Sequence, residues 1–243
     1  MFIFVKLRDW APLALAALLI AASFLLPGGY EAALPASAGA PGGLPTLIID
    51  AGHGGEDGGA STAGGALESA INLAVAQKLD ALAGLFGVET VLTRDSEAID
   101  YPVEAETTAQ RKRADQSARL KLINSVTDGV LISIHQNFYP DSRPAGPQVF
   151  YADTEDSRAL AELTHANLLS ALSPESRRVA APASEDIYLM REARCTAILA
   201  ECGFLSNPTE AALLGSDGYQ MRIAAVLLAS YLQFFTQGEL TAT

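Results

Sequence analysis

The sequence predicts an α/β fold, in which a mainly parallel, twisted sheet of about six strands carries helices on both faces of a single domain. Strand-like and helical segments alternate along the chain. The strand-like segments are apolar without strict alternation, which is typical of parallel strands buried on both faces. The chain has 243 residues and is 49% hydrophobic, enough for one sizeable domain and hardly for two.

The first half of the expected domain alternates between strand and helix. A β-branched run at residues 46–50 predicts a buried strand. Apolar residues at helical spacing predict a helix over 67–87, with Gly87 as its C-terminal cap. Three more elements follow: a strand at 88–94, a charged helix at 107–125 after a polar loop, and a strand at 129–135.

The second half continues the same pattern. The expected strands are 147–152, 187–191 and 196–201, and the expected helices are 157–172, 207–214 and 219–235. Pro208 suits the first turn of the helix at 207–214. Residues 173–185 are expected to form a loop.

The N-terminus is expected to lie outside this domain. Lys6 and Arg8 precede an apolar run that ends at Leu26, a pattern typical of a signal peptide or of a membrane anchor. Residues 27–45 are rich in Gly, Ala and Pro and are expected to form a linker. The catalytic domain is expected over residues 46–238.

Charge and cysteine content restrict the partners. The net charge of −12 repels phosphate backbones, so we expect no nucleic acid partner. Cys195 and Cys202 flank an apolar run and, if that run is extended, are too far apart to form a disulfide. The sequence carries no signal for an oligomeric state.

Four chemically active residues are predicted to meet at one edge of the sheet. His53, His135 and Glu201 lie at or just past the ends of expected strands, and Glu68 starts the first expected helix near the same edge. Open parallel sheets bind ligands at the carboxyl ends of their strands. We therefore expect two imidazoles and two carboxylates to lie close together.

This set of residues suits a hydrolytic zinc site. Such a site commonly has three protein ligands and an open position, and two histidines with a glutamate are a known solution. Zinc lowers the pKa of water towards about 7. A second carboxylate outside the metal shell is then available to accept and return a proton.

Several alternatives remain open at this level. The Gly-rich stretch around His53 could cradle a phosphate, although it lacks the usual glycine spacing and the Walker lysine. His135 could be a core histidine, and Glu68 a first-turn glutamate that favours the helix dipole. Either Glu56 or Asp57 could be the carboxylate ligand instead.

The remaining candidates have simpler interpretations. Glu201 could form a salt bridge to an arginine, and Cys202 could be a nucleophile or an inert buried thiol. His165 is expected to be a surface or packing residue of a helix. The charges from Arg111 to Arg119 are expected to form a solvated helix face.

Several motifs of the sequence together resemble those of a known protein family. The chain is similar to the zinc-dependent N-acetylmuramoyl-L-alanine amidases of the amidase-3 type over roughly residues 46–235. The motifs that carry the resemblance are IIDAGHGGEDGGA, the pair Leu67-Glu68, VLTRDS, SIHQN and ECGFLSNPTE, in the family's order.

The resemblance implies roles for single residues. It implies that His53, Glu68 and His135 bind one Zn²⁺ per chain and that Glu201 is the catalytic glutamate. The implied reaction cleaves the amide between the lactyl group of N-acetylmuramic acid and the L-alanine of the stem peptide. The implied partners are peptidoglycan glycan strands and stem peptides.

The resemblance also implies a setting. The substrate lies outside the membrane, so we expect extracytoplasmic action by a secreted protein, or by a membrane-anchored one if the N-terminal segment is uncleaved. The motif TTAQRKRADQSARLKLIN resembles the germination-specific spore-cortex branch, whose members allow muramic δ-lactam to form. The rival hypotheses are a zinc peptidase of wall peptides and a non-catalytic wall-binding protein on the same scaffold.

Overall fold

The structure is a computed structural model that describes residues 43–240. The expected signal peptide or anchor, and most of the expected linker, lie outside the described residues. Within the described part, none of the helices combines the length and the apolar character needed to cross a bilayer.

Six strands form one sheet, as the sequence predicts. In chain order they are β1 (Thr46–Ala51), β2 (Thr90–Leu92), β3 (Gly129–Asn137), β4 (Gln148–Tyr151), β5 (Ala181–Pro182) and β6 (Thr196–Phe204). Their order across the sheet is β2-β1-β3-β6-β4-β5. All neighbours are parallel except β4 and β6, which are antiparallel. The prediction of a mainly parallel sheet is confirmed.

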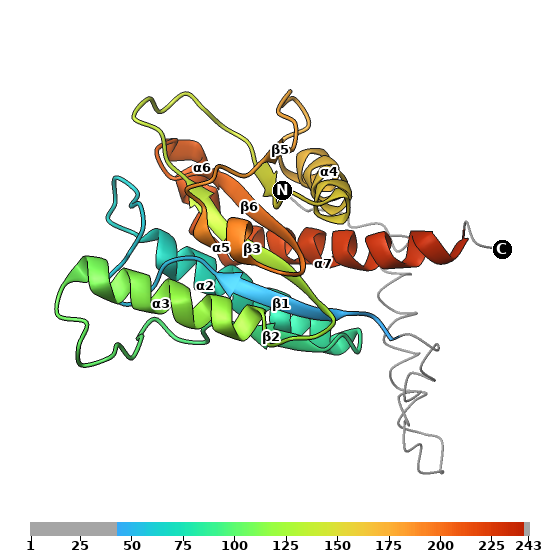
Figure 1. The fold of residues 1–243 in the computed structure, drawn as a ribbon. Coiled ribbons are helices and arrows are strands. Elements are labelled where there is room, and N and C mark those ends of the chain that lie inside the picture. The colour runs from blue at the N-terminus through green and yellow to red at the C-terminus, as the bar shows by residue number, and fades with distance from the viewer. Residues whose placement is uncertain (1–42, 241–243) are drawn as a thin grey trace, which may run out of the picture. The chain divides into compact units, whose positions relative to one another are not determined.

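Helices cover both faces of this sheet (Figure 1). One face packs against α2 (Glu68–Leu85), α4 (Glu155–Leu172) and α7 (Asp217–Leu240). The other face packs against α3 (Thr108–Ile123) and the short α5 (Tyr188–Glu192). The remaining helix, α6 (Pro208–Leu214), follows β6 and packs its Leu214 into the first of these cores.

The helix ends follow local capping rules. Helix α2 stops at a Schellman motif, in which Gly87 has φ +69° and the Val88 amide donates to the carbonyl of Ala83 at 3.0 Å. Helix α3 starts in a capping box between Thr107 and Gln110. Each cap satisfies backbone groups that a helix end leaves without a partner.

One expected strand is a helix. Residues 187–191 were predicted to be extended, but Tyr188–Glu192 form α5. The consecutive side chains Leu189 and Met190 are both buried against the sheet, whereas a strand would send them to opposite faces. A short apolar run does not distinguish the two structures by itself. The predicted loop at 173–185 also contains the two residues of β5.

A bulge shapes the carboxyl end of the sheet. His135 pairs in register with Glu201, but Asn137 pairs with Phe204, so β6 has one extra residue at this point. Strand β6 therefore continues past Glu201, where the sequence prediction ended it. Bulges next to active sites commonly redirect a side chain.

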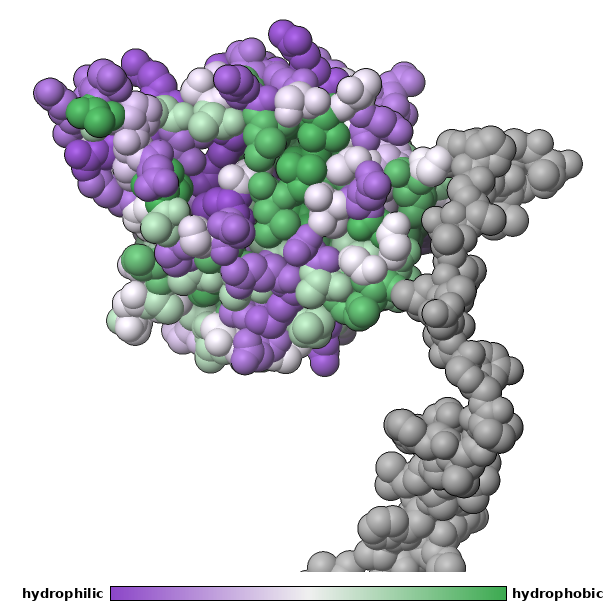
Figure 2. Space-filling model, turned by 90° about the horizontal axis from the view of Figure 1, so that it is seen from below, coloured by the Kyte–Doolittle hydropathy of each residue, from purple (hydrophilic) through white to green (hydrophobic). Residues whose placement is uncertain are grey.

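The surface is mixed on the side of α2, α3 and β2. Figure 2 views the molecule from this side and shows hydrophobic residues near the middle and towards the edges, interspersed with hydrophilic ones. The edge strand β2 is short, and all three of its residues are half-buried.

Candidate metal and catalytic site

The loop after β1 turns sharply so that His53 can face the end of the sheet. His53 has φ +60°, in the left-handed region that residues other than glycine rarely adopt. Gly52 precedes it, and a Cβ at Gly52 would lie only 2.2 Å from Nε2 of His135. A side chain there would displace the second imidazole, which explains a glycine directly before the histidine.

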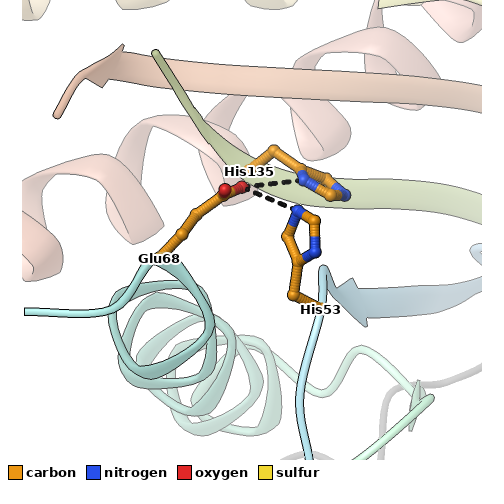
Figure 3. Close-up of side chains that lie close together, drawn as sticks. All are labelled: His53, Glu68 and His135. Atoms are coloured by element: carbon orange, nitrogen blue, oxygen red, sulfur yellow. Dashed lines mark hydrogen bonds and ion pairs between the residues drawn. The ribbon is translucent and has the colours of Figure 1, made fainter. Parts of the chain in front are cut away.

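Glu68 points towards both imidazoles from one side (Figure 3). It is the first residue of α2, and its side chain is buried. Its Oε1 atom is 3.3 Å from Nε2 of His53 and 3.0 Å from Nδ1 of His135. Its second oxygen, Oε2, accepts a hydrogen bond from the Ala60 amide at 2.9 Å, which fixes the carboxylate from the other side.

These three side chains fit a divalent metal. Each offers one ligand atom, and these atoms lie within 4.8 Å of one another. In a tetrahedral zinc site with bonds of about 2.1 Å, ligand atoms are roughly 3.4 Å apart. The two contacts of Glu68 are already at this spacing. The structure thus brings together the residues in which the sequence predicted a metal site.

The charges around Glu68 favour its ionised form. Burial by itself would raise the pKa of Glu68, but the hydrogen bonds from His135 and His53 outweigh it and hold this pKa well below its usual range. Burial would likewise lower the pKa of His53, whereas Glu68 and Asp57 raise it. A carboxylate that is ionised at neutral pH is ready to ligate a cation.

Asp57 orients His53 rather than joining the cluster. Its Oδ2 atom is 3.0 Å from Nδ1 of His53 and 2.8 Å from Nζ of Lys112. Although burial opposes it, hydrogen bonds from Lys112 and His53 lower the pKa of Asp57 to about 2. Such a carboxylate fixes the tautomer and orientation of a ligand histidine. The other alternative ligand, Glu56, forms an ion pair with Arg111.

Glu201 lies beside His135 on the neighbouring strand. The two residues are register partners in β6 and β3. Oε2 of Glu201 is buried and has no hydrogen-bond partner, so the alternative of a structural salt bridge to an arginine finds no support in the described chain. Burial, reinforced by the negative charge of Glu68, raises the pKa of Glu201 to about 7. A carboxyl group with this pKa can both accept and donate a proton near neutral pH.

A cavity adjoins this cluster. Its volume is about 600 Å³, and its lining is mostly small or apolar: Gly59, Ala60, Ser61, Thr62, Ala63, Phe138, Pro140, Leu205 and Ser206. Gly59 connects the cavity to the cluster, because a Cβ there would lie 2.5 Å from Oε2 of Glu68. The cavity thus provides space for a substrate directly beside the ligand atoms.

Two other candidates lie away from this chemistry. Cys202 is fully buried, and burial raises the pKa of its thiol, which disfavours the thiolate that a nucleophile needs. Cys202 and Cys195 are both free, as expected. His165 is buried within α4 and is a packing residue, in agreement with its expected role.

The expectation of a solvated face on α3 is wrong for Arg119. Its side chain is only 4% exposed, and its Nη1 atom is 2.9 Å from Oδ1 of Asp50. Asp50 gave a usable signal, because a carboxylate at the end of an apolar strand requires a buried partner. Arg94, the last residue of the strand expected at 88–94, is also buried. Sequence reasoning missed both arginines.

Comparisons with known proteins identify the family of this chain. Residues 47–230 match the family described as N-acetylmuramoyl-L-alanine amidase. The chain is 34% identical over 192 residues to the germination-specific N-acetylmuramoyl-L-alanine amidase of Bacillus subtilis, a match that covers 79% of this chain and 80% of the relative.

Solved structures of amidases have a similar fold. The CwlD amidase of Clostridioides difficile, solved in complex with the GerS lipoprotein, superimposes with a TM-score of 0.76 and 32% identity, covering 79% of this chain and 98% of that one. The amidase AmiC2 of Nostoc punctiforme gives a TM-score of 0.67 and 26% identity over 80% of this chain and 98% of that one. The chain therefore belongs to the N-acetylmuramoyl-L-alanine amidases, the peptidoglycan hydrolases that cleave between N-acetylmuramic acid and L-alanine.

Proposed function

We propose that this amidase is zinc-dependent, with one Zn²⁺ held by His53, Glu68 and His135, and that Glu201 is its general base and acid. The observation that carries the proposal is the approach of three ligand atoms to within 4.8 Å of one another. The register pairing of His135 with Glu201 supports the second part, since it places a carboxyl group beside the cluster.

When bound, zinc supplies a Lewis acid that polarises the lactyl carbonyl and lowers the pKa of water. Glu68 and the two histidines supply the ligand atoms, and Asp57 keeps Nε2 of His53 turned towards Glu68. Glu201 accepts a proton from the attacking water at Oε2 and then donates it to the alanine nitrogen, so that the peptide leaves as an amine.

The most direct test is mass spectrometry of purified peptidoglycan after digestion, with and without a chelator. We expect new L-alanine amino termini and glycan strands with intact lactyl groups, both abolished by the chelator. Cleavage inside the stem peptide would indicate a zinc peptidase instead. A protein that bound the wall without releasing either product would be the non-catalytic alternative.

We propose that the enzyme acts outside the cytoplasmic membrane, with residues 1–26 as a signal peptide or anchor, 27–45 as a linker and 46–238 as the catalytic domain. The substrate class supports this location. An anchor would also explain how a chain of net charge −12 stays close to an anionic wall. Fractionation of cells that express the full chain, with N-terminal sequencing of the product, tests whether the segment is retained.

We further propose a role in spore-cortex maturation, where removal of stem peptides precedes muramic δ-lactam formation. The support is the similarity to the germination-specific amidase of Bacillus subtilis, at 34% identity over 192 residues. Complementation of a spore former that lacks its cortex amidase tests this role. We expect the full chain to restore muramic δ-lactam, and Glu201→Gln not to restore it.

A further inference from the structure

Two buried arginines hold the loop that carries His53. Arg119 reaches it from α3, where Nη1 donates to the carbonyl of Ala51 at 2.6 Å and Nη2 donates to the carbonyl of His53 at 2.6 Å. The same guanidinium pairs with Asp50 at 2.9 Å. One side chain thus binds the backbone immediately before the turn and at the turn itself.

Arg94 reaches the same loop from the end of β2. Its Nε atom donates to the carbonyl of Ala51 at 2.8 Å, and Nη2 donates to the carbonyl of Gly52 at 3.1 Å. Nη2 also donates to the carbonyl of Ser69 at 2.8 Å, one residue past Glu68. Arg94 therefore connects the backbone that precedes His53 with the backbone that follows Glu68.

Guanidinium groups thus donate to all three carbonyls of residues 51–53. The carbonyl of Gly52 also accepts a hydrogen bond from Nδ2 of Asn72 at 3.1 Å. His53 holds a left-handed backbone conformation, φ +60°, that costs free energy for a residue with a Cβ. Such a conformation persists only where surrounding contacts over-determine it. The planar, forked guanidinium suits this task, because it binds several acceptors in fixed directions at once.

We infer that Arg119 and Arg94 are positioning residues that clamp the backbone of residues 51–53 and so hold the His53 imidazole towards Glu68 and His135. The inference deepens the proposed function, since it assigns the preorganisation of the proposed metal site to two residues that are not ligands. Neither arginine contacts the ligand atoms, so both act through the backbone.

Charge alone does not account for the arrangement. Asp50 already has Ser133 and Thr93 as hydroxyl donors, at 2.5 and 2.7 Å. One basic residue balances its charge, yet two guanidiniums are buried here. Arg94 forms no ion pair with Asp50. It donates its hydrogen bonds to backbone carbonyls and has one longer contact, at 3.5 Å, with the carboxylate of Glu97. The carbonyls are the feature that the two arginines share.

Amide hydrogen exchange of the metal-free full chain tests the clamp. In the wild type the amides of Gly52, Gly54 and Gly55 are hydrogen-bonded to Ile134, Asp57 and Glu97. In Arg119→Lys and Arg119→Gln we expect these three amides to exchange about tenfold faster than in the wild type, or more. The exchange rates of amides inside β3 and β6 serve as the internal reference and are expected to change less. Lysine keeps the charge beside Asp50 but loses the fork.

Two controls separate the clamp from a structural role. Leu168→Ala, in the core under α4, is expected to raise exchange across the whole domain without singling out the loop. The side chain of Arg158 is 64% exposed. Arg158→Gln is therefore expected to change exchange neither in the loop nor in the rest of the domain. Full protection in Arg119→Lys, or a loop that loosens only in step with β3 and β6, would overturn the inference.

Zinc titration against a chelating indicator gives the second readout. We expect Arg119→Lys and Arg94→Lys to bind zinc about 10- to 100-fold more weakly than the wild type. Unchanged zinc affinity in both variants would contradict the clamp. If the wild type itself bound no zinc, the proposed function would fail, while the exchange experiment would still decide whether the arginines fix the loop.

Discussion

The two faces of the sheet differ in what they bury. Among the residues that the structure describes, the face under α2, α4 and α7 belongs to a cluster of 27 buried hydrophobic residues, whereas the cluster under α3 and α5 has 8. The second face becomes polar towards the carboxyl edge, where Leu131 is followed at alternate positions by Ser133 and His135. On β6, Leu199 is followed in the same way by Glu201.

The two faces therefore contribute differently to the stability of the fold and to the chemistry of the site. The larger cluster excludes water and supplies most of the apolar burial that stabilises the fold. The smaller face buries fewer apolar side chains and contains buried ionic groups instead. Such groups contribute little to the free energy of unfolding unless they are fully paired. Changes on the two faces are therefore expected to have different consequences.

The largest expected effect lies at the polar edge. Glu201→Gln is expected to reduce amide hydrolysis by about 10²- to 10⁴-fold, because it removes the group that moves the proton. Zinc content is expected to stay at the wild-type level, measured by metal analysis of the same samples. Near-native turnover would remove Glu201 from the proposed mechanism.

The apolar face is expected to behave in the opposite way. Leu79→Ala removes a fully buried side chain of α2 and is expected to lower the free energy of unfolding by about 2–5 kcal/mol. Chemical denaturation measures this loss. At a temperature where the variant is folded, its zinc affinity is expected to match that of the wild type; a large drop would mean that the two regions are coupled.

The pH dependence of stability distinguishes Glu201 from its neighbours. Its pKa is raised from 4.5 to about 7, so the fold favours the protonated form. Below about pH 4.5 this carboxyl group has no effect on the free energy of unfolding. Between about pH 4.5 and 7 it ionises in the unfolded chain but stays protonated in the fold, so the metal-free protein loses stability as the pH rises. The cost amounts to roughly 3 kcal/mol, at about 1.4 kcal/mol for each pKa unit.

Denaturation of metal-free Glu201→Gln across this range measures the effect. We expect the variant to gain stability over the wild type between about pH 4.5 and 7 and to keep that gain above pH 7. Glu68 and Asp57, with lowered pKa values, lose stability as the pH falls, but both proteins share that loss. A difference that stays constant with pH would show that Glu201 titrates normally.

The smallest expected effect concerns the helix over the polar face. Thr107→Ala removes the capping box of α3 and is expected to cost about 1 kcal/mol. Because Arg119 lies several turns further along α3, the zinc affinity is expected to stay unchanged. Thermal unfolding and zinc titration of one preparation check both parts, and Thr107→Ser, which keeps a hydroxyl cap, is the matched control.

The strong patterns of the sequence predicted the fold well. Long periodic segments such as α2 and β-branched runs such as β1 were correctly assigned, because their apolar spacing allows one structure only. The prediction for residues 187–191 was wrong, because a run of four apolar residues followed by an arginine fits a strand or a helix, and packing against the neighbouring sheet decided the outcome. The bulge after Glu201 depends on the register between two strands, which a single sequence does not express.

The candidate site was partly predictable for a similar reason. His53, His135 and Glu201 lie at or just past expected strand ends, and strand ends meet at one edge of a parallel sheet. The choice of Glu68 over Glu56 and Asp57 came only from the resemblance to the amidase family. Arg119 was wrongly expected in solvent, because a charged helix gives no sign of which arginine turns inwards. Its burial depends on Asp50, which lies 69 positions away in the chain.

The central claim is that His53, Glu68 and His135 hold one zinc ion. Metal analysis of the full chain and of His53→Ala, combined with zinc X-ray absorption spectroscopy of the wild type, tests it most directly. We predict one zinc per wild-type chain with nitrogen and oxygen ligands only, and loss of that zinc in His53→Ala. An unchanged zinc content in the variant, or sulfur among the ligands, would contradict the claim.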